Sequence, residues 1–99
     1  MAEPINFKFD HGSKGSIGAT ALQMTTVDFE CQKGVVIKAA AGNSGKVYVG
    51  NSDVTADSAA ATDGLELSAG DAVTVEIDNV NKIWVIGSAV GQKVFWLTL

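Results

Sequence analysis

The alternation of apolar and polar side chains limits the fold of this sequence more than any other feature. Apolar residues fill every second position in residues 5–9, 27–31 and 73–77, and polar or charged residues lie between them. Successive side chains of a β-strand point to opposite faces, so a period of two predicts strands with one buried and one solvated face. Each of the three segments is therefore expected to be a half-buried strand.

A second kind of segment is apolar at consecutive positions. Four such runs are rich in β-branched and aromatic residues: 35–37, 47–49, 83–86 and 94–97. This composition favours strand over helix. Because both faces of each run are apolar, we expect these strands to be covered by a second sheet or by a neighbouring subunit.

Turn residues separate these runs at intervals of roughly ten residues, which is the spacing typical of a sandwich or barrel. Residues 33–34 and 42–45 are rich in glycine and polar residues, and we expect hairpin turns at 68–71, 78–81 and 88–91. The last four strands would then form an antiparallel meander. The sequence predicts an all-β fold, either a single antiparallel β-sandwich or a jelly-roll-like barrel, with an extended N-terminal arm.

The two least regular parts of the sequence set the expected domain limits. Residues 11–20 contain Gly12, Gly15 and Gly18, which indicates a flexible connection after the first strand. We therefore predict an arm and glycine-rich connection in residues 1–15 and one sandwich domain in residues 16–99. The polar, alanine-rich residues 51–64 are expected to form a loop, with room for one helical turn at 57–61.

The charge balance argues against two classes of partner. The chain has 7 lysines, no arginine and 11 acidic residues, for a net charge of −4. Arginine supplies the forked donors that suit phosphates and guanine, so its absence from an acidic chain argues against binding to nucleic acid or to an anionic membrane. The first ten residues lack the basic start and apolar run of a signal peptide, and synthesis in the cytoplasm is expected.

Residues that could carry catalysis are scarce. His11 is the single histidine and lies in the glycine-rich segment, which excludes multi-histidine zinc sites. The acids Glu30, Glu66, Glu76 and Asp78 lie on the wet faces of expected strands or beside turns, so they do not indicate a carboxylate pair for glycoside cleavage. The single Cys31 excludes an internal disulfide and is interpreted as a small buried residue. We expect no enzymatic activity and no cofactor.

Metal and phosphate sites are not indicated either. Asp53, Asp57 and Asp63 supply oxygen ligands of the type that calcium prefers, but their spacing matches no EF-hand, and turn residues explain them equally well. The sequence GNSGK at residues 42–46 lacks the spacing of a phosphate-binding loop and precedes a strand instead of a helix. We therefore predict no metal site.

Aromatic and arm residues are the candidate contact residues. The aromatic side chains of the apolar strands are expected to pack in the core or at a subunit interface. The alternating apolar residues of the arm could add a strand to the sheet edge of a neighbour. The predicted contact residues are Ile5, Phe7, Phe9, Tyr48, Trp84 and Trp96.

The C-terminal two-thirds of the chain carries a further pattern. It reads GVVIKAAAGNSGKVYVGNSDVTA from residue 34, and DGLELSAGDAVTVEIDNVNKIWVIGSAVGQKVFWLTL from residue 63. The order of a VYVG strand, a variable loop, an L-x-x-G-D turn, an IWVI strand and a last strand resembles small bacteriophage virion proteins, in particular head decoration or cement proteins. The shared motifs describe strands and turns, and they identify no ligand.

The resemblance implies a structural role on the virion. The chain is expected to bind the major capsid protein at the outer capsid surface, to decorate or stabilise the head, and to form a homotrimer, because such proteins commonly occupy threefold positions. The alternative is a tail or fibre module that recognises a host glycan or surface protein through residues 51–64 and the aromatics. A glycan-cleaving lysis enzyme is a third hypothesis, which the scarcity of catalytic residues disfavours.

Overall fold

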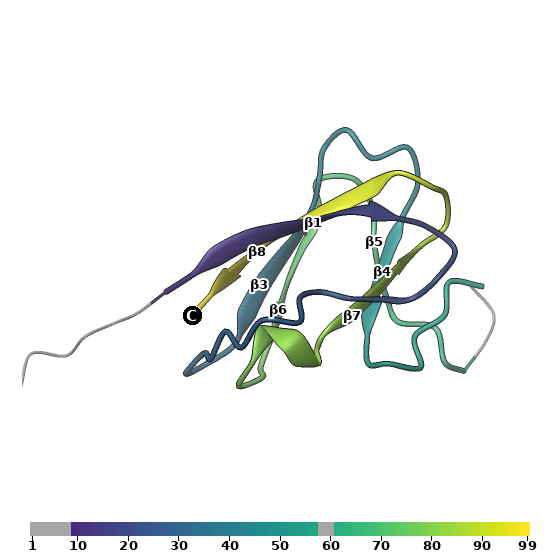
Figure 1. Ribbon diagram of the computed structural model, residues 1–99. Helices are drawn as coiled ribbons and strands as arrows, with labels where there is room; N and C mark the ends of the chain where they lie inside the picture. The colour runs from purple at the N-terminus through teal and green to yellow at the C-terminus, as the bar shows by residue number, and fades with distance from the viewer. Residues whose placement is uncertain (1–8, 58–60) are drawn as a thin grey trace, which may run out of the picture.

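The fold was established from a computed structural model that describes residues 9–57 and 61–99 (Figure 1). One 3₁₀ turn, η1 (Val80–Lys82), accompanies the strands. The strands are β1 (His11–Ile17), β2 (Leu22–Gln23), β3 (Val35–Ala39), β4 (Val47–Gly50), β5 (Leu65–Leu67), β6 (Ala72–Val75), β7 (Trp84–Gly87) and β8 (Gln92–Thr98).

The strands form two antiparallel four-stranded sheets. Sheet A has the order β1-β8-β3-β6, and sheet B has the order β2-β7-β4-β5. Two sheets of four strands with this alternation between layers form a jelly roll. The predicted all-β fold is therefore confirmed. The two sheets make it a β-sandwich, and its strand order is that of a jelly roll.

The core lies between the two sheets. Val35, Ile37 and Val94 of sheet A are fully buried, as are Val47 and Val85 of sheet B. Each of these residues is followed or preceded by a side chain that points away from the core, as the pleat of a strand requires. Burial of the inward-facing apolar side chains is the main term that favours the folded state.

The expected hairpin meander at the end of the chain is wrong. The strands β5, β6, β7 and β8 lie alternately in sheet B and sheet A, so the turns at 68–71, 78–81 and 88–91 cross between layers. Turn residues reverse the chain direction equally well within a sheet or between two sheets, and the sequence does not separate these cases. Among the described strands, only β4 and β5 are both consecutive and paired.

The predicted glycine-rich connection is a strand. Residues 11–17 form β1, which pairs with β8 from His11↔Leu97 to Ile17↔Gln92. Gly12 is required here for packing, because a Cβ atom at this position would lie 2.5 Å from Cζ2 of Trp96. The register shifts between Lys14 and Ile17, where Ser16 adopts a positive φ of 54°. The glycines therefore allow close approach and a bulge, and the segment belongs to the sheet.

Residues 27–31 were expected to form a strand, and this prediction is also wrong. They form a loop whose strand-like pairing is limited to one isolated bridge, Glu30↔Asn79. The loop is nevertheless anchored, because the ring of Phe29 lies 4.9 Å from the ring of Trp96 and the Cys31 thiol donates to the carbonyl of Ile77 at 3.0 Å. Alternating residues in this loop thus pack on the core without a partner strand.

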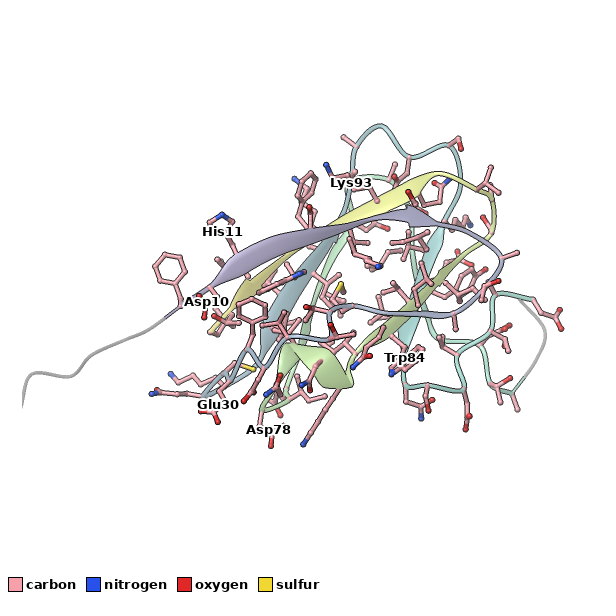
Figure 2. All side chains as sticks on the ribbon, viewed as in Figure 1. Asp10, His11, Glu30, Asp78, Trp84 and Lys93 are labelled. Carbon is pink, nitrogen blue, oxygen red and sulfur yellow. The ribbon has the colours of Figure 1, made fainter. Side chains whose placement is uncertain are left out.

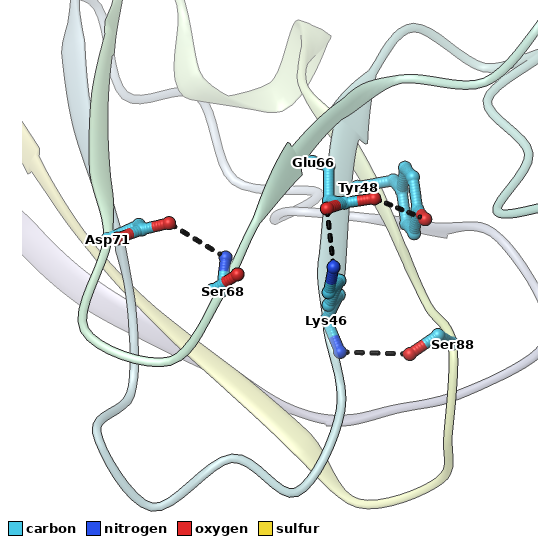
Figure 3. A network of polar contacts seen from close by, with 6 residues as sticks. All are labelled: Lys46, Tyr48, Glu66, Ser68, Asp71 and Ser88. Carbon is cyan, nitrogen blue, oxygen red and sulfur yellow. Dashed lines mark hydrogen bonds and ion pairs between the residues drawn. The ribbon is translucent and has the colours of Figure 1, made fainter. Parts of the chain in front are cut away.

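The outer face of sheet B is covered by the loop that follows β4. Tyr48, Val54 and Ile86 form a second buried cluster against which Trp84 packs. The sequence predicted a cover for both faces of β4, and the cover comes from the chain's own loop instead of a second subunit. At the border of this cluster, Tyr48 and Lys46 both donate to Glu66, at 2.8 and 2.7 Å (Figure 3).

Two predictions fall on residues outside the described ranges. Ile5 and Phe7 of the predicted arm precede residue 9, and the predicted helical turn at 57–61 includes residues 58–60, which are also outside. In the part of the chain that is described, no helix has the length and apolar composition needed to cross a membrane.

Candidate functional site

The outer face of sheet A exposes a continuous group of large apolar side chains. Phe9, Phe95, Leu97 and Leu99 are 65%, 46%, 38% and 44% exposed. Together with the half-buried Val36 of β3, these residues define what we call the apolar face. Contiguous exposed apolar surface of this kind is typical of a protein contact site.

Strand register brings the members of the apolar face together. β8 lies between β1 and β3, and Leu97 is opposite both His11 and Val36. Phe95 is likewise opposite Ser13 and Lys38. At the end of the sheet, the N–H and carbonyl of Asp10 both bond Thr98, which places Phe9 beside Leu99. Residues opposite one another in antiparallel strands share a face, so these side chains form one surface.

Charged residues lie along the border of the apolar face. Lys38 and Lys93 are in the outward phase of β3 and β8, whereas Lys14 is opposite the buried Val94 and lies in the inward phase of β1. The ammonium of Lys93 lies 4.9 Å from the centre of the Phe95 ring, as in a cation–π contact. The nearest acid that continues the outward alternation of β6 is Glu76, which follows the end of that strand. The face is therefore apolar, with Lys38 and Lys93 along one part of its border and Glu76 at another.

Acidic side chains gather at a different place, which we call the acidic end and define as Asp28, Glu30 and Asp78. Two adjoining shallow hollows share Glu30 and Cys31 in their walls, one reaching Asp28 and the other Asp78. The side-chain amide of Asn79 donates to Asp28. A hydrogen bond from Lys82, 2.7 Å away, lowers the pKa of Asp78 below its ordinary value. The carboxyl of Asp78 is thus ionised at neutral pH.

The structure places His11 and Cys31 in separate surroundings. His11 stands on the outer face of sheet A opposite Leu97, away from the acidic end. Burial, followed by the charge of Asp78, raises the pKa of the Cys31 thiol, which opposes formation of a reactive thiolate. Within residues 9–57 and 61–99, no three His, Cys, Asp or Glu side chains are close enough to hold a metal ion.

The loop after β4 carries a polar hollow lined by Asn51, Asp53 and Asp63 among others. Asp63 is used internally, because its carboxylate accepts hydrogen bonds from the Thr55 hydroxyl at 2.6 Å and the Asp57 amide at 2.9 Å. Such bonds are typical of a carboxylate that holds a loop in shape. Gly50, which also lines the hollow, is opposite Trp84 in the register of β4 and β7.

The residues predicted to make contacts are distributed over several environments. Phe9 belongs to the apolar face, and Trp84 is half-buried on the outer side of sheet B (Figure 2). Tyr48 and Trp96 are buried within the chain, under the loop and in the core respectively. Ile5 and Phe7 lie outside the described residues. Of the predicted contact residues that the structure describes, only Phe9 is part of the apolar face.

Sequence reasoning missed Phe95, Leu97 and Leu99 as contact residues. The run at 94–97 is apolar at each position, so the sequence did not separate the inward Val94 and Trp96 from the outward Phe95 and Leu97. The residues on either side of this run continue its alternation, since Lys93 and Leu99 point outward and Gln92 and Thr98 point inward. Gln92 and Thr98 are polar, however, so the inward positions could not be recognised by apolar side chains.

No protein-family model and no curated protein matches the chain. A jelly roll hosts many unrelated functions, so the fold alone does not assign one. Function must instead be argued from surfaces and sites. Of the surfaces described above, the apolar face combines the largest exposed apolar side chains with a defined charge border.

Proposed function

We propose that this chain is a capsid decoration protein that adheres to the outer surface of a bacteriophage head, with the major capsid protein as its partner. The apolar face is the observation that carries the proposal, because an exposed group of Phe9, Phe95, Leu97 and Leu99 is costly in water unless a protein surface covers it. The resemblance of residues 34–99 to virion proteins supports the same role.

The physics of a capsid lattice suits a small module of this kind. A lattice repeats each contact by symmetry, so interfaces of modest individual strength hold firmly when many copies are linked. An adhesive module needs a rigid scaffold and an apolar surface, and it needs no catalytic group. The jelly roll supplies the scaffold, and the outer face of sheet A supplies the surface.

The predicted arm would add a second contact. Ile5, Phe7 and Phe9 alternate with polar residues, as in a strand that joins the edge of another sheet. We propose that this arm binds the capsid or an adjacent subunit, in an assembly for which the resemblance implies three copies. Deletion of residues 2–8 is expected to weaken both capsid binding and self-association.

Binding to undecorated capsids tests the proposed function. The full chain is mixed with capsids purified from the phage that encodes it, and bound protein is measured after sedimentation. Leu97→Lys is expected to reduce binding at least about tenfold, because it places a charge in the centre of the apolar face. Val90→Lys is the matched control, since Val90 is 81% exposed and lies in the loop before β8.

Two outcomes of this experiment contradict the proposal. One is wild-type protein that does not sediment with capsids at any concentration. The other is a low copy number on the intact particle, because hundreds of copies are expected for a head protein and only a handful for a tail protein. Mass spectrometry of the purified particle measures that number directly.

The hollow beside Trp84 supports the alternative of a tail or fibre module that recognises a host glycan. Half-buried tryptophan next to carboxylate and amide oxygens is a combination that binds sugar rings and their hydroxyls. Binding to a glycan array that is lost in Trp84→Ala, with an unchanged circular dichroism spectrum, would favour this alternative. Loss of capsid binding in Leu97→Lys would favour decoration.

A further inference from the structure

Inward-facing side chains are left uncovered between the edge of sheet A and the edge of sheet B. β6 is the last strand of sheet A and β5 the last strand of sheet B, and the turn at 68–71 joins them. Leu67, beside this turn, is 4% exposed, whereas Leu65, in the same inward phase of β5, is 55% exposed. Val75 and Ile77 also pack on the core and remain half-buried. The described residues therefore leave the core open where the two edges separate.

An apolar hollow of about 240 Å³ lies at this opening. Apolar side chains from both sheets line it: Val49, Leu65, Val75, Ile77 and Ile83. Lys82 also borders it, and the ammonium of this lysine is paired with the carboxylate of Asp78 at 2.7 Å. A closed apolar cavity of about 150 Å³ is large enough to hold benzene, so the hollow has room for a phenyl ring. It is smaller than most pockets for small molecules, which measure about 300–1,000 Å³.

We propose that this hollow receives Phe7 and Ile5 of a second copy of the chain, and that residues 5–8 of that copy add a strand to the edge of β6. This inference deepens the self-association in the proposed function, on which it rests, because it names the place that the arm occupies on the adjacent subunit. The ligand is thus an extended segment with apolar side chains at alternate positions.

The alternation of the arm matches an edge strand beside an apolar opening. In an added strand, Ile5 and Phe7 share one face, and Asn6 and Lys8 share the other. When the apolar pair points into the hollow, the polar pair lies on the solvated side of sheet A, where Glu76 continues the outward phase of β6. The unpaired edge of β6 supplies the backbone groups that an added strand needs.

The length of the chain before residue 9 excludes the hollow of the same copy. Asp10 and Val75 lie at the same end of sheet A, three strand spacings or about 14 Å apart. The hollow lies beyond β6, towards sheet B. An extended chain covers at most about 3.5 Å per residue, so Phe7 and Ile5 lie within about 7 and 14 Å of Phe9. These side chains can therefore fill the hollow of a neighbour and cannot fill their own.

The contact leaves the apolar face available to the capsid, because it uses the inner side and the edge of β6. The arm of one copy meets the sheets of the next, so the contact joins two different surfaces. Such a contact forms a closed ring when the rotation between neighbours closes, and an open filament when it does not. A ring of three is the form that agrees with the expected homotrimer.

The mass of the purified full chain without capsids tests the proposal, by light scattering and by sedimentation over a concentration series. Species heavier than the 10.2 kDa chain are expected. Phe7→Asp in the arm and Leu65→Asp in the wall of the hollow are each expected to weaken self-association at least about tenfold. Asn6→Asp is the control in the arm, on its other face. Val27→Asp is the control for Leu65, since Val27 is 54% exposed and Leu65 is 55% exposed.

A synthetic peptide with the sequence of residues 1–10 makes the test independent of folding defects. In excess, it is expected to occupy the hollow of the unaltered full chain and to dissociate the assembly to monomers. The same peptide with Phe7→Asp is expected to leave the mass unchanged. Equal effects of the two peptides would overturn the proposal.

Three results with the variants also overturn it. The first is a monomer at every concentration of the wild-type chain. The second is an assembly that Phe7→Asp weakens and Leu65→Asp does not, because the arm then binds elsewhere. The third is an assembly that Leu65→Asp weakens and Phe7→Asp does not, because the hollow then holds another segment.

The two proposals can fail separately. Protein that remains monomeric and still sediments with capsids overturns the contact between arm and hollow, and leaves the decoration function standing. Protein that self-associates through Phe7 and Leu65 and does not sediment with capsids supports that contact and overturns the decoration function.

Discussion

The side-chain carbonyl of Gln92 accepts a hydrogen bond from the backbone N–H of Gly45 at 2.8 Å. The amide nitrogen of the same side chain donates to the Ser44 hydroxyl at 3.0 Å and to the Val90 carbonyl at 2.7 Å. Gln92 is fully buried, so its polar atoms have no access to water and depend on these partners. One side chain therefore ties the loop between β3 and β4 to the loop between β7 and β8.

Replacing Gln92 with leucine is expected to destabilise the protein by about 2–3 kcal/mol, because the Gly45 N–H and the Val90 carbonyl lose their partner in a water-poor place. Ser44→Ala removes one hydrogen bond and is expected to cost about 1 kcal/mol. Urea unfolding measures both changes. A Gln92→Leu midpoint equal to that of wild type would show that water replaces the lost bonds.

Gly12→Val is expected to destabilise the protein by about 1–3 kcal/mol, because its Cβ would overlap the indole of Trp96 and force the ring to move. Gly15→Ala is the control in the same strand, since a Cβ at Gly15 meets no atom within 4 Å. Thermal unfolding gives the stability, and tryptophan fluorescence reports displacement of the ring. Equal melting temperatures for the two variants would contradict the packing of β1 over Trp96.

Ile37→Ala and Phe95→Ala test which side of sheet A faces the core. Ile37 is fully buried, and its loss is expected to cost about 2–5 kcal/mol through the cavity that it leaves. Phe95 is 46% exposed, and its loss is expected to cost less than about 1 kcal/mol. Denaturant unfolding measures both. The reverse order would mean that the strands are shifted by one residue, which exchanges the two faces.

The contribution of Glu66, on the outer face of sheet B, to the free energy of unfolding should depend on pH. Hydrogen bonds from Lys46 and then Tyr48 hold the pKa of Glu66 below its ordinary value of 4.5. Because the pKa is lower in the folded than in the unfolded chain, ionised Glu66 stabilises the fold above the ordinary pKa, and this contribution is lost as the pH falls through the folded pKa.

Glu66→Gln removes the charge and keeps the shape, so its effect isolates this contribution. The melting temperature of the variant should lie below that of wild type at about pH 7, and the difference should shrink at about pH 3. The effect is expected to be small, because Lys46 and Glu66 are 49% and 40% exposed and water screens such pairs. A difference that grows in acid would contradict the assigned sign.

The strands that were predicted correctly from the sequence are the runs of consecutive apolar residues. Strands were expected at 35–37, 47–49, 83–86 and 94–97, and each overlaps an observed strand. The errors fall where packing differs from the local pattern. Gly12 and Gly15 lower strand propensity, yet β1 forms by pairing with β8, and Gly12 leaves the space that the indole of Trp96 fills. Phe29 and Cys31 alternate as in a strand, yet each packs on the core from a loop.

The candidate surface was only partly predictable. Phe9 was named from its alternation, whereas Phe95, Leu97 and Leu99 needed the pairing of β8 with β1 and β3. The order of strands across a sheet depends on contacts between distant residues, and local patterns carry little information about it. Tyr48 was predicted to pack in the core or at a subunit interface, and the structure buries it under the chain's own loop.

The central place of β8 has a consequence for synthesis of the protein. Its neighbours β1 and β3 are made early, but both wait for residues 92–98 before their shared hydrogen bonds can form. Sheet A therefore cannot close until translation has passed Thr98 and that residue has left the ribosome. A nascent chain holds two unpaired strand edges until then, and unpaired edges of this kind are prone to aggregation.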